Sequence, residues 1–162
     1  MKVLNLSSQE AALNDGYNLL FVIDADDLTM ATATTAQTIT LFTCSIGDDF
    51  RACSIYLKTP FENTADAASI LTTAVVGYTG TTNGFITSTE LNKNGTFVTQ
   101  AKGPSTAVAP FTAATAILLT IAAPTTGKKL SDINKGELHI YFKLLRVAKL
   151  AGARSSETIL TK

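Results

Sequence analysis

The chain has 162 residues, a length that suits one domain with a hydrophobic core of its own. Hydrophobic residues make up 46% of the chain and charged residues only 16%, a balance that argues against intrinsic disorder. The formal net charge is zero, so no overall field favours nucleic acid or a membrane surface as a partner.

Short segments typical of β-strands follow one another along the chain, separated by turn residues. Residues 1–16 end at the turn signal Asn14-Asp15-Gly16, and we expect them to form an N-terminal arm. The predicted strands are, in order, 17–23, 37–45, 50–58, 69–78, 84–91, 96–100, 115–122 and 137–147. The predicted turns between them are Gly47-Asp48-Asp49, Thr79-Gly80, Asn83-Gly84, Asn94-Gly95, Gly127 and Asn134-Lys135-Gly136.

About eight short strands with regular turns predict an all-β fold, an antiparallel β-sandwich or a jelly-roll-like barrel, with extended N- and C-terminal arms. We expect an arm at 1–16, a sandwich domain at 17–147 and a C-terminal arm or tail at 148–162. The uncharged stretch 103–127 contains prolines and threonines and falls short of a membrane-spanning helix, so we expect a buried strand there. The N-terminus lacks the apolar core of a signal peptide, which predicts synthesis without export.

Charge is unevenly distributed along the chain. Residues 1–66 carry nine acids and three bases, whereas residues 128–162 carry eight bases and three acids. Either the two segments favour head-to-tail pairing of copies or an acidic partner for the tail, or folding brings their charges together and they cancel.

Chemistry-bearing motifs are few. The single histidine, His139, lies in a run whose alternation places it beside Tyr141 on the face opposite Leu138 and Ile140, and we expect a surface or half-buried position. Nucleophile motifs, phosphate-binding loops and zinc-protease motifs are absent from the sequence. We therefore expect no catalytic residues, no cofactor and no enzymatic activity. A small hydrolase using carboxylates such as Asp24 and Asp48 is the weakest alternative.

Cys44 and Cys53 are the only cysteines. If Asp48-Asp49 formed a two-residue hairpin loop, the two thiols would face each other across paired strands. An unexported protein folds in a reducing cytosol, so buried or half-buried free thiols are the expectation, with a disulfide as the alternative. Two thiols without a nearby histidine cannot complete a zinc site.

Carboxylates gather at Asp24-Ala25-Asp26-Asp27 and at Asp48-Asp49. Two such loops brought together would offer oxygen ligands to calcium. Aspartate is also a preferred turn residue, and this second interpretation is the one that we favour. We predict no metal site.

The order of the strand and turn segments along the chain is similar to that of a known class of proteins. The run 34–41, Thr-Thr-Ala-Gln-Thr-Ile-Thr-Leu, precedes Ile46-Gly47-Asp48-Asp49-Phe50, and the run 130–141 reads Leu-Ser-Asp-Ile-Asn-Lys-Gly-Glu-Leu-His-Ile-Tyr. In this plan, over roughly residues 17–147, the chain resembles small virion structural proteins of tailed bacteriophages, of the head decoration (cement) or appendage kind.

The resemblance implies a protein of the capsid surface, made in the host cytoplasm, that binds and stabilises the shell of the major capsid protein. It also implies a homo-oligomer, with a trimer favoured. The alternative is a tail, neck or head-fibre component that contacts other virion proteins or host glycans. We expect the partner-binding residues to lie at the chain ends and at edge aromatics: Phe61, Phe111, Lys149, Leu150, Arg154, Ile159 and Leu160.

Overall fold

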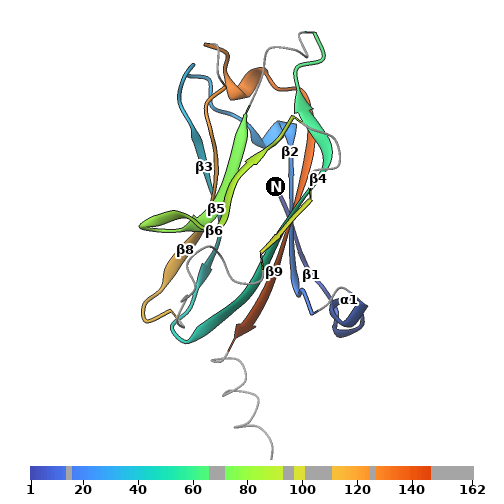
Figure 1. Cartoon of the computed structure of the whole chain (residues 1–162), viewed down its shortest axis with the longest axis vertical. Helices are drawn as coiled ribbons and strands as arrows, with labels where there is room; N and C mark the ends of the chain where they lie inside the picture. Colours follow the sequence, from blue (N-terminus) through green and yellow to red (C-terminus); the bar gives the residue numbers. More distant parts are fainter. Residues whose placement is uncertain (14–15, 66–71, 93–96, 101–110, 125–126, 147–162) are drawn as a thin grey trace, which may run out of the picture.

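Two antiparallel sheets packed face to face make up the fold (Figure 1). The computed structural model describes residues 1–13, 16–65, 72–92, 97–100, 111–124 and 127–146. One sheet has five strands in the order β1 (Lys2–Asn5), β2 (Leu19–Asp24), β9 (Lys135–Arg146), β4 (Asp48–Glu62) and β7 (Phe97–Gln100). The other has four, in the order β3 (Gln37–Cys44), β8 (Thr115–Ile121), β5 (Thr73–Tyr78) and β6 (Thr81–Glu90). Three short helical segments lie among the described residues: α1 (Ser8–Leu13) between β1 and β2, η1 (Ala25–Asp27) between β2 and β3, and η2 (Leu130–Asp132) between β8 and β9.

The core lies between the sheets and is built by alternating side chains from both. In β8, Ile117, Leu119 and Ile121 are buried while the residues between them are half-buried. Aromatic rings connect the layers: Phe50 of the five-stranded sheet stacks on Phe85 of the four-stranded sheet with ring centroids 3.7 Å apart. Burial of this apolar surface is the main force holding the two sheets together.

The predicted fold class is confirmed as a β-sandwich, because the described strands form two separate sheets and do not close into a barrel. Each predicted strand overlaps a strand of the structure, and the buried strand expected within 103–127 is β8. Within the described part of this stretch, β8 therefore serves the core of the sandwich.

The turn predicted at Asn83-Gly84 is wrong, because both residues lie inside β6. The hairpin turn is Thr79-Gly80 alone, since Tyr78 already pairs with Thr81. Gly84 serves packing here: a Cβ on it would lie 2.7 Å from a ring atom of Tyr78. The glycine that suggested a turn at Asn83-Gly84 instead permits the close approach of two strands, a role for which glycine is as well suited as for a turn.

The segment predicted as an N-terminal arm contains β1 and α1. β1 pairs antiparallel with β2, from Lys2 opposite Val22 to Asn5 opposite Leu19, so it extends the five-stranded sheet at its edge. The amino group of Met1 forms an ion pair with Asp27 that ties the chain end to η1. The C-terminal arm or tail predicted at 148–162 lies outside the described residues.

Candidate interaction surfaces

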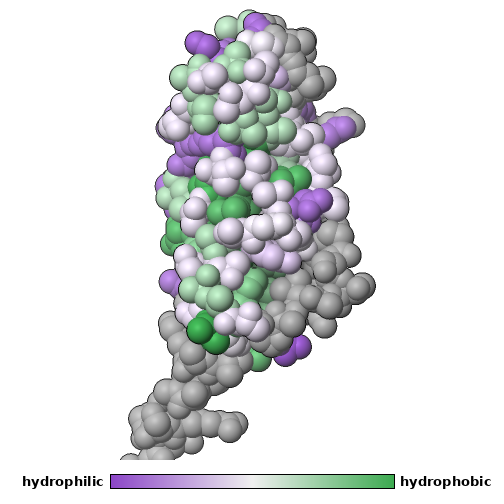
Figure 2. All heavy atoms as spheres, turned by 90° about the vertical axis from the view of Figure 1, so that its left-hand side faces the viewer, coloured by the Kyte–Doolittle hydropathy of each residue, from purple (hydrophilic) through white to green (hydrophobic). Residues whose placement is uncertain are grey.

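The outer face of the four-stranded sheet carries almost no charge. Among the residues of β3, β5, β6 and β8, the only charged one is Glu90. We call the outward-facing residues of the three strands β3, β8 and β5 the neutral face: Thr38, Thr40, Thr43, Ala116, Leu118, Thr120, Thr73 and Val75. Figure 2, which looks onto this side of the molecule, shows mostly white and green atoms there.

Register and side-chain chemistry explain the neutral face. Thr38 and Val75 lie opposite Thr120 on its two sides, so small β-branched side chains form a row across three strands, and Thr40 lies opposite Leu118 in the neighbouring row. The hydroxyl groups of Thr38 and Thr120 are 3.2 Å apart and share a hydrogen bond. The face is therefore weakly polar, with short side chains that lose little conformational entropy when covered.

The outer face of the five-stranded sheet has a different character. Lys58 of β4 lies 2.9 Å from Glu137 of β9, and His139 Nε2 lies 2.7 Å from the same carboxylate oxygen. The hydrogen bonds from His139 and then Lys58 hold the pKa of Glu137 below its usual value. The rings of Tyr56 and Tyr141 flank His139 in edge-to-face contacts. Burial raises the pKa of Tyr141 above its ordinary value.

The half-buried position predicted for His139 is confirmed, with its side chain 16% exposed and Leu138 and Ile140 buried on the opposite face. Tyr56, whose ring contacts His139, and Lys58, which shares the partner Glu137, come from a strand far away in sequence, and only the pairing of β4 with β9 brings them together. Lys58, Glu137, His139 and Tyr141 are joined by hydrogen bonds, so the arrangement is typical of a structured surface.

Charges of the two sequence segments meet in space. Glu62 of the acidic segment pairs with Lys135 of the basic segment, and Lys58 of the first pairs with Glu137 of the second. Where β4 pairs with β9, charges of the two segments therefore intermix, as the second interpretation predicts.

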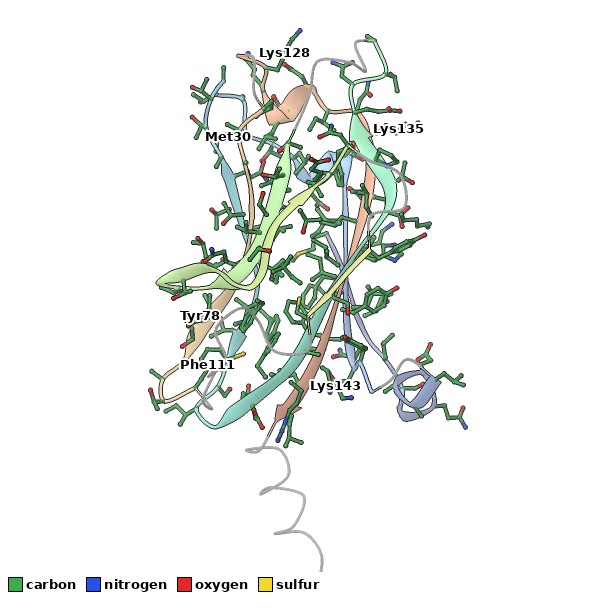
Figure 3. The ribbon with its side chains drawn as sticks, in the orientation of Figure 1. Met30, Tyr78, Phe111, Lys128, Lys135 and Lys143 are labelled. Carbon is green, nitrogen blue, oxygen red and sulfur yellow. The ribbon has the colours of Figure 1, made fainter. Side chains whose placement is uncertain are left out.

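The structure gives Phe61 and Phe111 a core role in place of the predicted surface role. Phe61 is fully buried against Gly136, whose φ of 153° belongs to the region that glycine favours. Phe111 is 8% exposed and packs edge-to-face on Tyr78, with ring centroids 5.8 Å apart (Figure 3). Phe61 lies near the end of β4 and Phe111 lies in the segment before β8, and the side chains of both are buried. The other predicted partner residues, Lys149, Leu150, Arg154, Ile159 and Leu160, lie outside the described residues.

The hairpin considered for Cys44 and Cys53 does not form, because β3 and β4 belong to different sheets and the turn at 45–48 crosses between them. Cys44 and Cys53 are both buried, free thiols, in agreement with the expectation from the reducing cytosol. Burial raises the pKa of Cys53 well above its ordinary value, so this thiol stays protonated and unreactive.

The two aspartate clusters do not meet. Asp24 lies opposite Glu137 and Asp48 opposite Arg146, at the two ends of β9, which places them about 30 Å apart. The carboxylate of Asp27 accepts a hydrogen bond from the backbone of Asp24, and that of Asp48 accepts one from Ser45, as in capped turns. Within the described part of the chain, no three His, Cys, Asp or Glu side chains are grouped closely enough to hold a metal ion.

No described helix has the length and apolarity needed to cross a membrane. No family model matches the chain, and no curated protein matches it either. Among solved structures, the chain is similar to one from "Structure of infectious bursal disease virus Gt strain", at 20% sequence identity and a TM-score of 0.35. That match covers 83% of this chain but only 34% of the other, so the chain spans about a third of the length of that neighbour.

Proposed function

We propose that this chain is a capsid decoration (cement) protein of a tailed bacteriophage, which binds and stabilises the shell formed by the major capsid protein. The setting comes from the sequence resemblance, and the observation that carries the binding role is the neutral face. Interface cores are depleted of charged residues, because burying an unpaired charge is unfavourable. A sheet face with no charge in three adjacent strands suits burial against a protein lattice.

This role is mechanical and non-enzymatic. The neutral face would contact the shell, and repetition of the same contact over many copies would strengthen binding through multivalency. Copies would stand as homotrimers at local threefold positions of the virion surface, as the resemblance implies. No cofactor, nucleic acid or membrane takes part in the proposal.

Binding to shells of the same phage that lack this protein tests the proposal. Wild-type protein should bind them saturably, at fixed stoichiometry, and raise their resistance to heat. Thr40→Lys places a charge on the neutral face and should weaken binding at least tenfold, whereas Thr40→Ser should leave it unchanged. The matched control Tyr56→Lys adds the same charge to the outer face of the five-stranded sheet and should bind as wild type.

Absence of saturable shell binding by the wild type would refute the proposed function. Weakening by Tyr56→Lys but not by Thr40→Lys would retain the function and move the contact to the other sheet.

The tail, neck or head-fibre alternative finds support in the cluster of Tyr56, His139 and Tyr141, since tyrosine rings with polar neighbours are common in interfaces with proteins and glycans. Copy number separates the two. A decoration protein is present in hundreds of copies per particle, whereas an appendage is present in tens or fewer, and quantitative gel analysis of purified virions distinguishes them.

A further inference from the structure

Strand β1 contributes to the sheet without burying any of its own side chains. All four of its residues are exposed, including the apolar Val3 at 48% and Leu4 at 50%. β1 ends the strand order of the five-stranded sheet, and no described strand pairs with its outer side (Figure 1). Natural edge strands are protected by charges, prolines or bulges, because their free backbone groups otherwise pair with another chain. Lys2 is the one charged residue on this strand.

The hydrogen bonding of β1 fixes which of its backbone groups point away from the sheet. The N–H of Leu6 donates to the carbonyl of Asn18 at 3.0 Å, in the same register that sets Leu4 opposite Leu20. Because backbone groups of a strand alternate between its two sides, Leu4 shares the orientation of Leu6 and bonds to β2. Val3 and Asn5 therefore direct their N–H and C=O groups outward.

We propose that β1 pairs antiparallel with β1 of a second copy of this chain, across a twofold axis that passes beside Leu4. In this register Val3 of each copy lies opposite Asn5 of the other. Each such pair exchanges two backbone hydrogen bonds, so about four outward groups on each strand find partners at once. The two five-stranded sheets become one continuous sheet.

The side chains fit a second copy in this register. Leu4 lies on the outer face of the sheet beside the buried Leu20, so the axis sets the two Leu4 side chains next to each other and extends an apolar row. Lys2 lies opposite Leu6, and the two Lys2 residues are about 14 Å apart along the strands, beyond the screening length at physiological salt.

The competing self-paired register is poorer. An axis through Val3 would form one complete hydrogen-bonded pair and set Met1 opposite Asn5, although the amino group of Met1 is already engaged with Asp27. The register with the axis beside Leu4 is therefore preferred. A twofold contact through β1 is compatible with a trimer formed through another surface, because closed assemblies can combine twofold and threefold axes. A four-residue edge buries little area, so we expect a weak, concentration-dependent contact.

Cysteine cross-linking of the full chain tests the register. Opposed residues of a non-hydrogen-bonded pair have Cα atoms about 4.5 Å apart, within disulfide range, so Leu4→Cys should form covalent dimers on oxidation. Val3→Cys would place its two Cα atoms about 9 Å apart, beyond that range, and serves as the matched control. Oxidised samples are compared on non-reducing denaturing gels over a concentration series, and wild type gives the background of the buried Cys44 and Cys53.

We expect Leu4→Cys to cross-link at least tenfold faster than Val3→Cys. A second substitution separates pairing from chance collision: Val3→Pro removes an outward N–H while leaving the bonds to β2, so in the Leu4→Cys background it should abolish the dimer. Val3→Ala keeps that N–H and should not. Circular dichroism verifies that every variant is folded. Equal rates for the two cysteine variants, no dimer from Leu4→Cys, or a dimer that survives Val3→Pro would each overturn the proposal.

Discussion

The two sheets share one core but present opposite chemistry to their surroundings. The strands of the five-stranded sheet carry both signs of charge, among them Lys58 and Glu137, whereas the four-stranded sheet offers threonine, alanine and leucine with Glu90 as its one charge. Inward-facing positions are apolar in both, because burial demands it. The comparison teaches that the core constrains the inner faces of the sheets but not the charge of their outer faces. The outer faces are therefore where binding sites should be sought.

The largest expected effect concerns the part that the two sheets share. Phe142 of β9 is fully buried and contacts the rings of Phe21, Phe42 and Phe50. Phe142→Ala should lower the free energy of unfolding by about 3–5 kcal/mol in a urea titration followed by circular dichroism. A single transition is expected, since one core serves both sheets. Separate unfolding of the two sheets would break the comparison, and the half-buried Phe42→Ala, with a smaller loss, is the control.

A smaller effect should be confined to the charged sheet. The pKa of Glu137 is lowered in the folded state by His139 and Lys58, so ionisation of this carboxylate stabilises the fold above its unfolded pKa of about 4.3. That contribution disappears as the pH falls through the lower folded value. Glu137→Gln should therefore reduce stability by less than about 1 kcal/mol at pH 7, and the difference from wild type should vanish in strong acid.

Thermal unfolding at a series of pH values measures this difference. Thr40→Ser, on the neutral face, should give a pH profile parallel to that of wild type. A pH-independent penalty for Glu137→Gln would show that the hydrogen bonds, and not the charge, matter at this position.

The smallest effect should come from the neutral face itself. Thr38 and Thr120 share a hydrogen bond across β3 and β8, and such exposed cross-strand pairs contribute about 0.2–1 kcal/mol. A double-mutant cycle with Thr38→Val and Thr120→Val measures the coupling energy by chemical denaturation. A coupling near zero would mean that these hydroxyl groups serve the surface and contribute nothing to the fold.

Sequence reasoning located the strands because strand patterning is local. The alternation around His139 predicted which side chains of β9 are buried, and the structure agrees. Which strands pair with each other is not determined locally, and this is why the hairpin considered for Cys44 and Cys53 does not form. The sequence of a turn between successive strands looks the same whether the strands pair or lie in opposite sheets. The surface role predicted for Phe61 and Phe111 was wrong for a related reason, since the local sequence does not reveal which strands cover an aromatic ring. The edge strand β1 escaped notice because four residues give too short a pattern.

The sequence by itself determined that this protein is all-β, with short strands separated by turns, because hydrophobic alternation and turn chemistry act over a few residues. Only the tertiary structure decided that, among the described strands, every charged residue except Glu90 lies in the five-stranded sheet, and that β1 is left at an open edge. Strand pairing is chosen by the fit of the whole core, where each pairing closes a long loop and succeeds only when the other strands are in place. The surfaces proposed for function follow from that choice.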